Sequence, residues 1–442
     1  MDANLDQNDP EMAAYLAMSR ALEAIEHEPP ARVAEMQWRQ VARLAADAAA
    51  QSRFWRERLR PVFRNGAFDR AAWREIPILT RAEAQRESRA MRAASVPAAD
   101  GIVYDGETSG SSGTPLHYTS TARAVMVSRV LTERLIDWHG LDPHSRTAAI
   151  RAGVGNYGVY PEGSVSQGWS MRAPEQTHHL LTVLTPLDQQ LEWLGRVRPR
   201  YLITYPTNLR ALADEARRSG ARLALDAVLT VGELVQDETR ALARQVFGSR
   251  LIDTYACEEV GKIALQCEVS GRYHICPTSA SVEIVNPAGS PVRPGETGEV
   301  VVTGLHNRAT FFLRYALGDC AVVAAAPCPC GRTLPTLERI LGRTRSALIL
   351  PGGGRFWVEE ELVIAFRPHA PFRQFQIVQT APDRIEFRYV PDGPARPPDE
   401  AAINAIASVI HPQMKVQAIA VTEIPRSAGG KYEDVVGLAL PP

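Results

Sequence analysis

The sequence predicts an α/β fold, with a large N-terminal domain built on a parallel or mixed sheet and a small α+β C-terminal domain. Three observations predict it. Strand-like and helix-like segments alternate from residue 146 to residue 255, which indicates βαβ units and a parallel sheet. Short alternating apolar runs between Gly and Pro turns follow from residue 281 and indicate antiparallel β structure. Beyond residue 342, β-like and α-like segments mix in a stretch of the length of a small separate domain.

The N-terminal part predicts helical cover. Residues 11–50 are rich in Ala and Glu, with apolar residues at helical spacing. A further helix is expected from Ser120 to His139, because Gly140 ends the pattern.

The alternating region predicts a sheet edge where ligands bind. The ligand-binding edge of such a sheet lies at the carboxyl ends of the strands. Tyr205, Gly232, Glu233 and the run from Tyr255 to Glu259 fall at this edge. The expected strands are 146–151, 201–205, 227–231 and 250–255, and the expected helices are 188–197, 208–219 and 236–247.

The remaining elements fix the predicted domains. Short strands are expected at 282–285, 298–303, 311–315 and 320–323. Residues 342–346 are expected to form a hinge, followed by elements in the order β, α, β, β, α, β. The predicted domains are 1–342 (helical cover 1–100, βαβ part 101–280, β-rich part 281–342) and 343–442.

Composition narrows the function. Of 442 residues, 45% are hydrophobic and 22% charged, which is typical of a globular protein, and 49 basic against 50 acidic residues give a net charge of −1. That balance argues against binding to nucleic acid or to an anionic membrane. The acidic N-terminus has no apolar segment, and there is no run of about 18 apolar residues. We therefore expect a cytoplasmic protein without a membrane span; the sequence leaves homodimer formation open.

Six cysteines need an explanation other than disulfides in such a compartment. Cys328 and Cys330 form a Cys-Pro-Cys-Gly turn, and a short hairpin could bring Cys267 beside His274. A Cys₃His set suits tetrahedral Zn²⁺ in a closed structural site. The alternative is four buried residues that never meet, since 53 residues separate His274 from Cys328. The other cysteines, Cys257, Cys276 and Cys320, are expected to be small core residues.

The segment from Thr108 to Pro115, Thr-Ser-Gly-Ser-Ser-Gly-Thr-Pro, predicts a loop between two strands. Its backbone N–H groups and hydroxyls could face a phosphate chain with no large side chain in the way. It is not a Walker P-loop, because no Gly-Lys-Ser/Thr opens a helix. Taken alone, it favours a flexible linker or a plain hairpin turn over a phosphate-binding loop.

Five further motifs follow in order. They are Tyr255-Ala-Cys-Glu-Glu259, Gly295-Glu-Thr-Gly-Glu299, Arg314-Tyr-Ala-Leu-Gly-Asp319, Gly342-Arg343 and Pro425-Arg-Ser-Ala-Gly-Gly-Lys431. With the loop, this succession resembles the adenylate-forming superfamily and, within it, the phenylacetate–coenzyme A ligase-like branch. The resemblance runs from about Phe54 to the C-terminus. Residues 54–59 and 76–81 resemble the opening of that branch, without recognisable chemistry of their own.

The resemblance implies ATP-dependent activation of a carboxylic acid with Mg²⁺. In the family, the loop binds the β- and γ-phosphates, a Glu binds Mg²⁺, an Asp binds the ribose hydroxyls, and further residues cradle adenine. Glu259 matches the Mg²⁺ ligand and Asp319 the ribose ligand. The matching nucleotide-binding residues are Thr108, Ser109, Gly110, Ser111, Ser112, Gly113, Thr114, Gly232, Glu233, Tyr255, Ala256, Asp319 and Arg343. Some members of the branch also carry the Cys₃His pattern as a structural zinc site.

Lys431 is the predicted catalytic lysine. Gly429 and Gly430 before it would let a long cationic side chain reach the cleft from a mobile C-terminal lid domain. In the family this lysine bridges the attacking carboxylate and the α-phosphate. The sequence departs from the family pattern at Thr114, Ala256, Glu258 and Arg345, so fewer phosphate contacts are expected and the switching role of the hinge is in doubt.

The acid is expected to bind between the strand ends and residues 153–160. Tyr157, Tyr160, Tyr205 and Trp169 would line an aromatic pocket suited to an aryl or arylacetic acid, with no cation placed for a second charge. Core packing is the alternative explanation for these rings. The acceptor is expected to be coenzyme A; an amine acceptor, or an inactive binding protein that kept the fold, are the alternatives.

Overall fold

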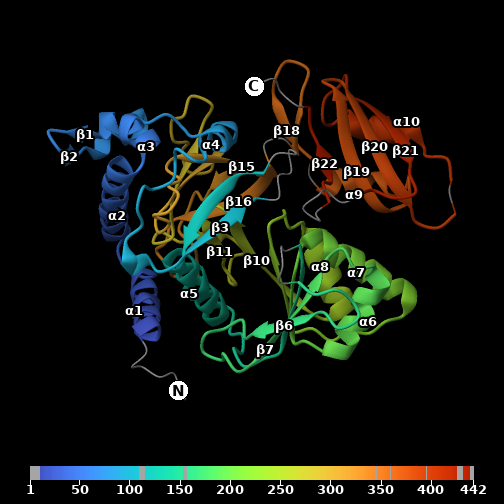
Figure 1. Cartoon of the computed structure of the whole chain (residues 1–442). Coiled ribbons are helices and arrows are strands. Elements are labelled where there is room, and N and C mark those ends of the chain that lie inside the picture. The colour runs from blue at the N-terminus through green and yellow to red at the C-terminus, as the bar shows by residue number, and fades with distance from the viewer. Residues whose placement is uncertain are drawn as a thin grey trace.

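The computed structural model describes residues 10–108, 115–152, 157–343, 346–358, 360–394, 396–425 and 432–438. A mixed sheet of 12 strands lies at its centre (Figure 1). Across the sheet the strand order is β13, β14, β15, β16, β12, β11, β10, β9, β8, β5, β7, β6. The predicted α/β fold class is confirmed. The strands are β5 (Thr147–Arg151), β6 (Ser164–Gln167), β7 (Thr177–Thr182), β8 (Tyr201–Thr204), β9 (Ala227–Val231), β10 (Arg250–Cys257), β11 (Gly261–Gln266), β12 (Tyr273–Ile275), β13 (Ala280–Val285), β14 (Thr297–Gly304), β15 (Tyr315–Val323) and β16 (Thr336–Arg343).

The predicted βαβ series forms the parallel part of this sheet. Strands β7, β5, β8, β9 and β10 are neighbours in that order, and each adjacent pair is parallel. Helices α6 (Leu187–Val197), α7 (Pro206–Ser219) and α8 (Asp237–Phe247) share a buried apolar cluster with these strands. Helix α7 begins at Pro206, two residues before the prediction, because proline suits the first turn of a helix. The carboxyl ends of β5, β8, β9 and β10 thus lie along one edge.

The rest of the sheet is antiparallel, as predicted from residue 281 onward. It joins the parallel part where β10 pairs with β11, and the register shifts there between Tyr255 and Ala256. The expectation of a strand over residues 311–315 is wrong, since only Tyr315 belongs to one. Arg314 has a left-handed backbone (φ 46°), which breaks the extended path. Its buried guanidinium holds this conformation by hydrogen bonding to Glu283 and to the carbonyls of Arg74 and Ile76.

A separate hairpin carries the ends of the Gly/Ser-rich loop. Strands β3 (Val103–Glu107) and β4 (His117–Thr121) are antiparallel, in agreement with the expected strands on either side of the loop. Helix α5 (Ala122–Trp138) follows directly, and Thr121 caps it by accepting a hydrogen bond from the Ala124 N–H.

The N-terminal segment covers the sheet mainly with helices, as expected. Helices α1 and α2 lie beside α5 and the antiparallel strands (Figure 1, blue). None of the helices in the described ranges has both the length and the apolar character that a membrane span requires. The elements are α1 (Pro10–Ile25), α2 (Pro30–Gln51), α3 (Arg53–Arg58), η1 (Arg60–Val62), β1 (Phe63–Arg64), β2 (Ala67–Phe68), η2 (Arg70–Glu75), α4 (Arg81–Glu87) and η3 (Ala98–Asp100).

The C-terminal residues form a unit with its own sheet and its own buried cluster (Figure 1, orange to red). A four-stranded sheet in the order β21, β20, β19, β22 packs with two helices, and a β17–β18 hairpin precedes them. The sequence predicted a single strand before the first helix of this unit, where the structure has the two strands of the β17–β18 hairpin. It contacts the parallel part through two ion pairs, Arg210 of α7 with Asp434 and Arg367 with Glu238 of α8, and through the Arg210 guanidinium, which lies 5.7 Å from the Phe375 ring centroid. The elements are β17 (Ala347–Ile349), β18 (Arg355–Trp357), α9 (Glu360–Phe366), β19 (Phe372–Ala381), β20 (Arg384–Pro391), α10 (Glu400–Ala407), β21 (Lys415–Ala420) and β22 (Val435–Val436).

Candidate active site

The two ends of the Gly/Ser-rich loop are held together by Thr108. The Thr108 N–H donates to the Leu116 carbonyl (3.0 Å), and the Leu116 N–H donates to the Thr108 hydroxyl oxygen (3.1 Å). Closure at this point fixes where the loop leaves the hairpin. The predicted phosphate-binding residues Ser109, Gly110, Ser111, Ser112, Gly113 and Thr114 lie outside the described residues.

Arg81 connects the base of this loop to the predicted Mg²⁺ ligand. Its Nη2 donates to the Thr108 hydroxyl, and its Nη1 lies 3.1 Å from Oε1 of Glu259. Arg81 reaches this place because Leu79 forms backbone hydrogen bonds with Arg314 and Ala316 at the start of β15, and α4 begins two residues later. The sequence indicated no chemistry for residues 76–81. A single arginine among many gave no signal, and its partners are 27 and 178 residues away.

Glu259 is a buried carboxylate in the turn between β10 and β11. The Tyr315 hydroxyl donates to its Oε1 (3.1 Å), the same oxygen that faces Arg81. Burial and the neighbouring Glu259 charge raise the pKa of Tyr315, so this phenol remains a donor. The turn is fixed to the loop hairpin because the Tyr118 hydroxyl of β4 donates to the Glu258 carbonyl (2.8 Å). Glu259, Thr108 and Arg81 therefore form one connected group.

Asp319 forms the second polar group of this edge, together with Tyr255 and Arg343. The Tyr255 hydroxyl donates to Oδ2 of Asp319 (2.8 Å), and Nε of Arg343 lies 3.1 Å from Oδ1. Burial and the Asp319 charge raise the pKa of Tyr255, and the Asp319 carboxylate raises the pKa of Arg343. Each carboxylate oxygen accepts more than one hydrogen bond, so Asp319 can still accept from vicinal hydroxyls. Ala256 follows Tyr255 at the irregular register of β10.

Gly232 and Glu233 follow β9 at the same edge. Gly232 has a positive φ of 80°, which a side chain would strain. Oε2 of Glu233 accepts hydrogen bonds from the Thr207 N–H (3.0 Å) and the Thr207 hydroxyl (2.7 Å). This carboxylate therefore binds the first turn of α7. A contact of Gly232 and Glu233 with adenine would be made by their backbone atoms.

The predicted aromatic pocket is only partly assembled. Tyr157 and Tyr205 both lie beside Arg151, the last residue of β5, and both hydroxyls are within hydrogen-bonding reach of its guanidinium. Tyr160 instead lies against α6, with the Arg196 guanidinium 5.3 Å from its ring centroid. The sequence-based expectation that no cation lies at the predicted acid pocket is therefore wrong, because Arg151 lies beside Tyr157 and Tyr205.

Trp169 lies away from the other rings of the predicted pocket. Its ring centroid is 5.5 Å from that of Tyr201. Tyr201 begins β8, whereas Tyr205 follows the end of that strand, so Trp169 lies toward the opposite end of β8. It packs against the apolar cluster that includes α5.

The catalytic lysine predicted from the sequence, Lys431, lies outside the described residues. The chain is described again from Tyr432. Asp434 pairs with Arg210, one helical turn from the start of α7, and α7 starts at the carboxyl end of β8. The described residues after Lys431 are thus tied to the predicted ligand-binding edge.

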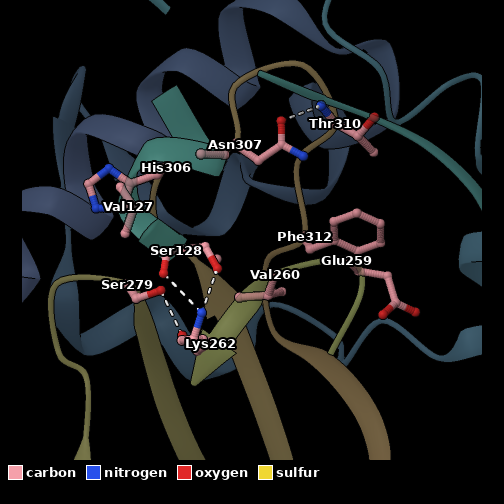
Figure 2. Close-up of a pocket in the computed structure, with 12 residues that line it drawn as sticks. Val127, Ser128, Glu259, Val260, Lys262, Ser279, His306, Asn307, Thr310 and Phe312 are labelled. Carbon is pink, nitrogen blue, oxygen red and sulfur yellow. Dashed lines mark hydrogen bonds between the residues drawn. The ribbon is translucent and has the colours of Figure 1, made fainter. Parts of the chain in front are cut away.

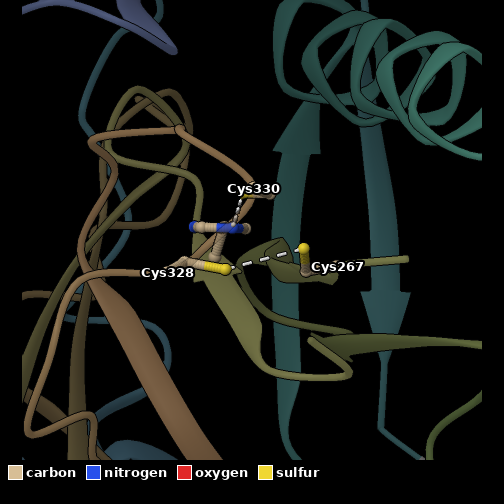
Figure 3. Close-up of side chains that lie close together, drawn as sticks. Cys267, Cys328 and Cys330 are labelled. Carbon is tan, nitrogen blue, oxygen red and sulfur yellow. Dashed lines mark hydrogen bonds between the residues drawn. The ribbon is translucent and has the colours of Figure 1, made fainter. Parts of the chain in front are cut away.

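The four predicted metal ligands come together, and Figure 3 shows the three cysteines among them. One ligand atom each from Cys267, His274, Cys328 and Cys330 lies within 4.8 Å of all the others. The Cys267 and Cys328 sulfurs are 3.7 Å apart, and Nε2 of His274 is 3.2 Å from the Cys330 sulfur. Strand β12 pairs with β16, and this pairing closes the separation of 53 residues in the sequence.

The surroundings of the cluster orient its ligands. The Thr336 hydroxyl of β16 lies 3.2 Å from Nδ1 of His274. The Trp138 ring of α5 packs edge-on against the imidazole, with 5.6 Å between the ring centroids. Burial lowers the pKa of His274 to about 4, so the ring is neutral at pH 7. Glu26 at the end of α1 accepts from the Trp138 indole (2.9 Å) and from Arg332 (3.2 Å). The cluster therefore joins α1, α5 and the antiparallel strands.

The remaining cysteines pack as small apolar residues. Cys276 and Cys320 are buried, and burial raises the pKa of Cys276 to about 12. Cys257 is half-buried at the end of β10, and burial and the Glu259 charge raise its pKa. None of these three has the environment that favours a reactive thiolate.

Comparison with known proteins agrees with this arrangement. Residues 48–310, more than half of the chain, match the family model described as AMP-binding enzyme. The chain belongs to the AMP-binding enzyme family. The chain is 26% identical over 241 residues to the phenylacetate-coenzyme A ligase of Thermus thermophilus, covering 52% of this chain and 54% of the relative. It is 27% identical over 199 residues to that of Escherichia coli, covering 43% and 45%. The chain spans about half the length of the curated relatives it matches, and the predicted superfamily and branch are confirmed.

Solved structures show the same fold for this chain. A 2-hydroxyisobutyryl-CoA ligase in the postadenylation state, in complex with 2-HIB-AMP, matches with a TM-score of 0.70 at 17% identity, covering 93% of this chain and 90% of that one. The amide bond synthetase McbA from Marinactinospora thermotolerans matches with a TM-score of 0.51 at 18% identity, covering 74% and 67%.

Proposed function

We propose that this protein activates a carboxylic acid with ATP as an acyl-adenylate, releases pyrophosphate, and transfers the acyl group to coenzyme A. An aryl or arylacetic acid is the proposed substrate. The carboxylate oxygen attacks the α-phosphorus and pyrophosphate leaves; the thiol then attacks the acyl carbon and AMP leaves. The first step makes the carboxylate oxygen part of a good leaving group.

The observation that carries this proposal is the pair of polar groups along one sheet edge. Thr108, Arg81 and Glu259 form the first, and Asp319, Tyr255 and Arg343 form the second. In the proposal, Arg81 and the loop neutralise phosphate charge, while Asp319 accepts hydrogen bonds from the ribose hydroxyls. Lys431 approaches from the C-terminal unit and holds the carboxylate beside the α-phosphate.

Two metal ions fit the residues present. The Glu259 carboxylate is a hard oxygen ligand suited to Mg²⁺, which when bound neutralises charge on the triphosphate. Ligands about 2.0–2.3 Å from a tetrahedral Zn²⁺ lie about 3.3–3.8 Å apart, close to the 3.2 and 3.7 Å separations in the Cys₃His cluster. We assign this cluster to structural Zn²⁺, because four protein ligands leave no open position for water.

An amine acceptor is the second candidate. The likeness of the fold to that of an amide bond synthetase supports this candidate, as does the lack of a recognisable coenzyme A motif in the sequence. An inactive binding protein is the third candidate, favoured by the departures at Thr114, Glu258 and Arg345.

Acid-dependent ATP–pyrophosphate exchange tests the proposal. We expect exchange with at least one member of a panel of aryl and arylacetic acids, and none without acid. Mass spectrometry of reactions supplied with coenzyme A or with amines then separates acyl-CoA from amide products. Absence of exchange across the panel, with ATP binding retained, would favour the inactive binding protein.

The position of Arg81 predicts a role in binding ATP. Replacing Arg81 by methionine removes a cation beside the loop and leaves the buried Glu259 carboxylate without its ion-pair partner. We expect the KM for MgATP in the exchange assay to rise about tenfold or more, since a hydrogen bond to a charged group contributes about 1.5–3 kcal/mol. Arg86→Met, on the exposed side of the same helix, is the matched control. Equal KM values for the two variants would contradict this role.

A further inference from the structure

Arg151 lies at the proposed acid-binding edge with its charge uncompensated by the described residues. It ends β5, and its Nε is shielded from solvent and has no hydrogen-bond partner in the described part of the chain. No ion pair joins it to a carboxylate within the described ranges. Arg151 is half-buried, and shielding part of a guanidinium from water without a counter-ion carries a free-energy cost, so such groups are normally paired.

The neighbours of Arg151 do not neutralise it. The Tyr205 ring centroid lies 5.8 Å from its Cζ, and Tyr157 flanks it as well. Burial raises the pKa of Tyr157, so this phenol carries no charge at pH 7. The Glu258 carboxylate is close enough to act on Arg151 electrostatically, but it is exposed and forms no ion pair with it.

A second half-buried cation, Lys262 of β11, lies close enough for the Arg151 charge to act on it. Its ammonium donates only to neutral groups of α5: the Ser128 carbonyl (2.9 Å), the Ser128 hydroxyl (3.2 Å) and the Thr132 hydroxyl (2.8 Å). Burial, with a further contribution from the Arg151 charge, lowers the pKa of Lys262 to about 8. Lys262 and Glu259 line the same small cavity (Figure 2), and Glu259 is already paired with Arg81.

The Arg151 guanidinium is therefore not ion-paired with any carboxylate of the described residues, since Glu259 and Asp319 at this edge pair with Arg81 and Arg343. In the proposed reaction, the carboxylate that is adenylated lies beside the α-phosphate of ATP and is therefore not the partner of Arg151. A second anionic group on the acid would compensate Arg151, and the guanidinium fork matches a carboxylate in shape and hydrogen-bonding pattern. The flanking tyrosine rings suit an aromatic spacer between the two carboxylates.

We propose that Arg151 binds a second carboxylate of the substrate, which makes aromatic dicarboxylic acids the substrate class of this enzyme. The inference rests on the proposed function, because it assumes that the other carboxylate is the one adenylated. Arg151 is in this view a specificity-determining residue, and the tyrosines position its guanidinium.

Calorimetric binding of matched acids to the full-length protein tests this inference. Each pair consists of benzoate or phenylacetate and the same acid with a second carboxylate at the ortho, meta or para position. We expect at least one dicarboxylic isomer to bind about 10- to 100-fold more tightly than its parent, as a charge-assisted contact implies. Arg151→Gln should abolish this preference, Arg151→Lys should keep part of it, and Arg222→Gln, at an exposed arginine, should leave it unchanged.

Two results would overturn the inference: no dicarboxylic isomer binds more tightly than its parent, or the preference persists in folded Arg151→Gln. Thermal melting verifies that each variant is folded. If Arg151→Gln does not fold, the preference for dicarboxylic acids is measured in Arg151→Lys, and an unchanged preference there would contradict the inference. Exchange assays with the same acids keep the two proposals apart. Exchange with monocarboxylic acids alone would support the proposed function and contradict this inference. Arg151-dependent binding of dicarboxylic acids without any exchange would do the reverse.

Discussion

Replacing Lys431 by alanine is expected to lower acid-dependent ATP–pyrophosphate exchange by about 100- to 1,000-fold, the usual effect of removing one group that stabilises developing charge. The adenylation step brings a carboxylate against the α-phosphate, and a flexible cation opposes the repulsion between them. The loss should appear in kcat, with ATP binding by calorimetry nearly unchanged.

Lys415→Ala is the matched control. Lys415 is exposed on β21 of the same C-terminal unit, and only Lys262, Lys415 and Lys431 are lysines in this chain. Exchange by Lys431→Ala at the level of Lys415→Ala would refute the catalytic role of Lys431.

Cys328→Ser is expected to release the metal and destabilise the large domain. The four ligand atoms are already within 4.8 Å of one another, so a bound Zn²⁺ would link strands that are distant in sequence. Loss of a structural metal belongs to the largest mutational effects, about 4 kcal/mol or more, which corresponds to a fall in Tm of about 10 °C. Elemental analysis of the purified protein and a melting curve measure both effects.

Cys276→Ser separates metal loss from the cost of a buried hydroxyl, because Cys276 is buried but outside the cluster. It should keep one zinc per chain. Wild-type protein that contains no zinc when purified without chelator would dismiss the zinc assignment.

The regular parts of this molecule could be predicted from local sequence. The βαβ segment follows from apolar runs and helix-ending glycines, and β9 has the predicted bounds. The Cys/His cluster was also predictable, because each half is short and the donor chemistry is specific. What the sequence did not show is the β12–β16 pairing that joins the halves. The strand expected over 311–315 failed because Arg314 is held in a left-handed conformation by partners far along the chain.

The polar contacts of the site were less predictable. Arg81 and Arg151 are ordinary arginines in a chain with 49 basic residues, and their roles depend on Glu259, Thr108 and Tyr205, which only the fold brings near. Glu259 and Asp319 could be predicted because each is the acidic residue of a short sequence motif that matches the family pattern. The roles of Lys431 and of the Gly/Ser-rich loop stay predictions.

The ion pairs Arg210–Asp434 and Arg367–Glu238 bear on how easily the C-terminal unit changes position. Arg367–Glu238 is partly exposed and contributes little, about 0–1 kcal/mol. Arg210–Asp434 is largely shielded from solvent, and the Arg210 guanidinium also lies over the Phe375 ring of β19. The buried clusters on either side have no residue in common. A change in position of the C-terminal unit would therefore break no shared apolar core, but it would separate the shielded Arg210–Asp434 pair. Dissolved salt would weaken mainly the more exposed Arg367–Glu238 pair.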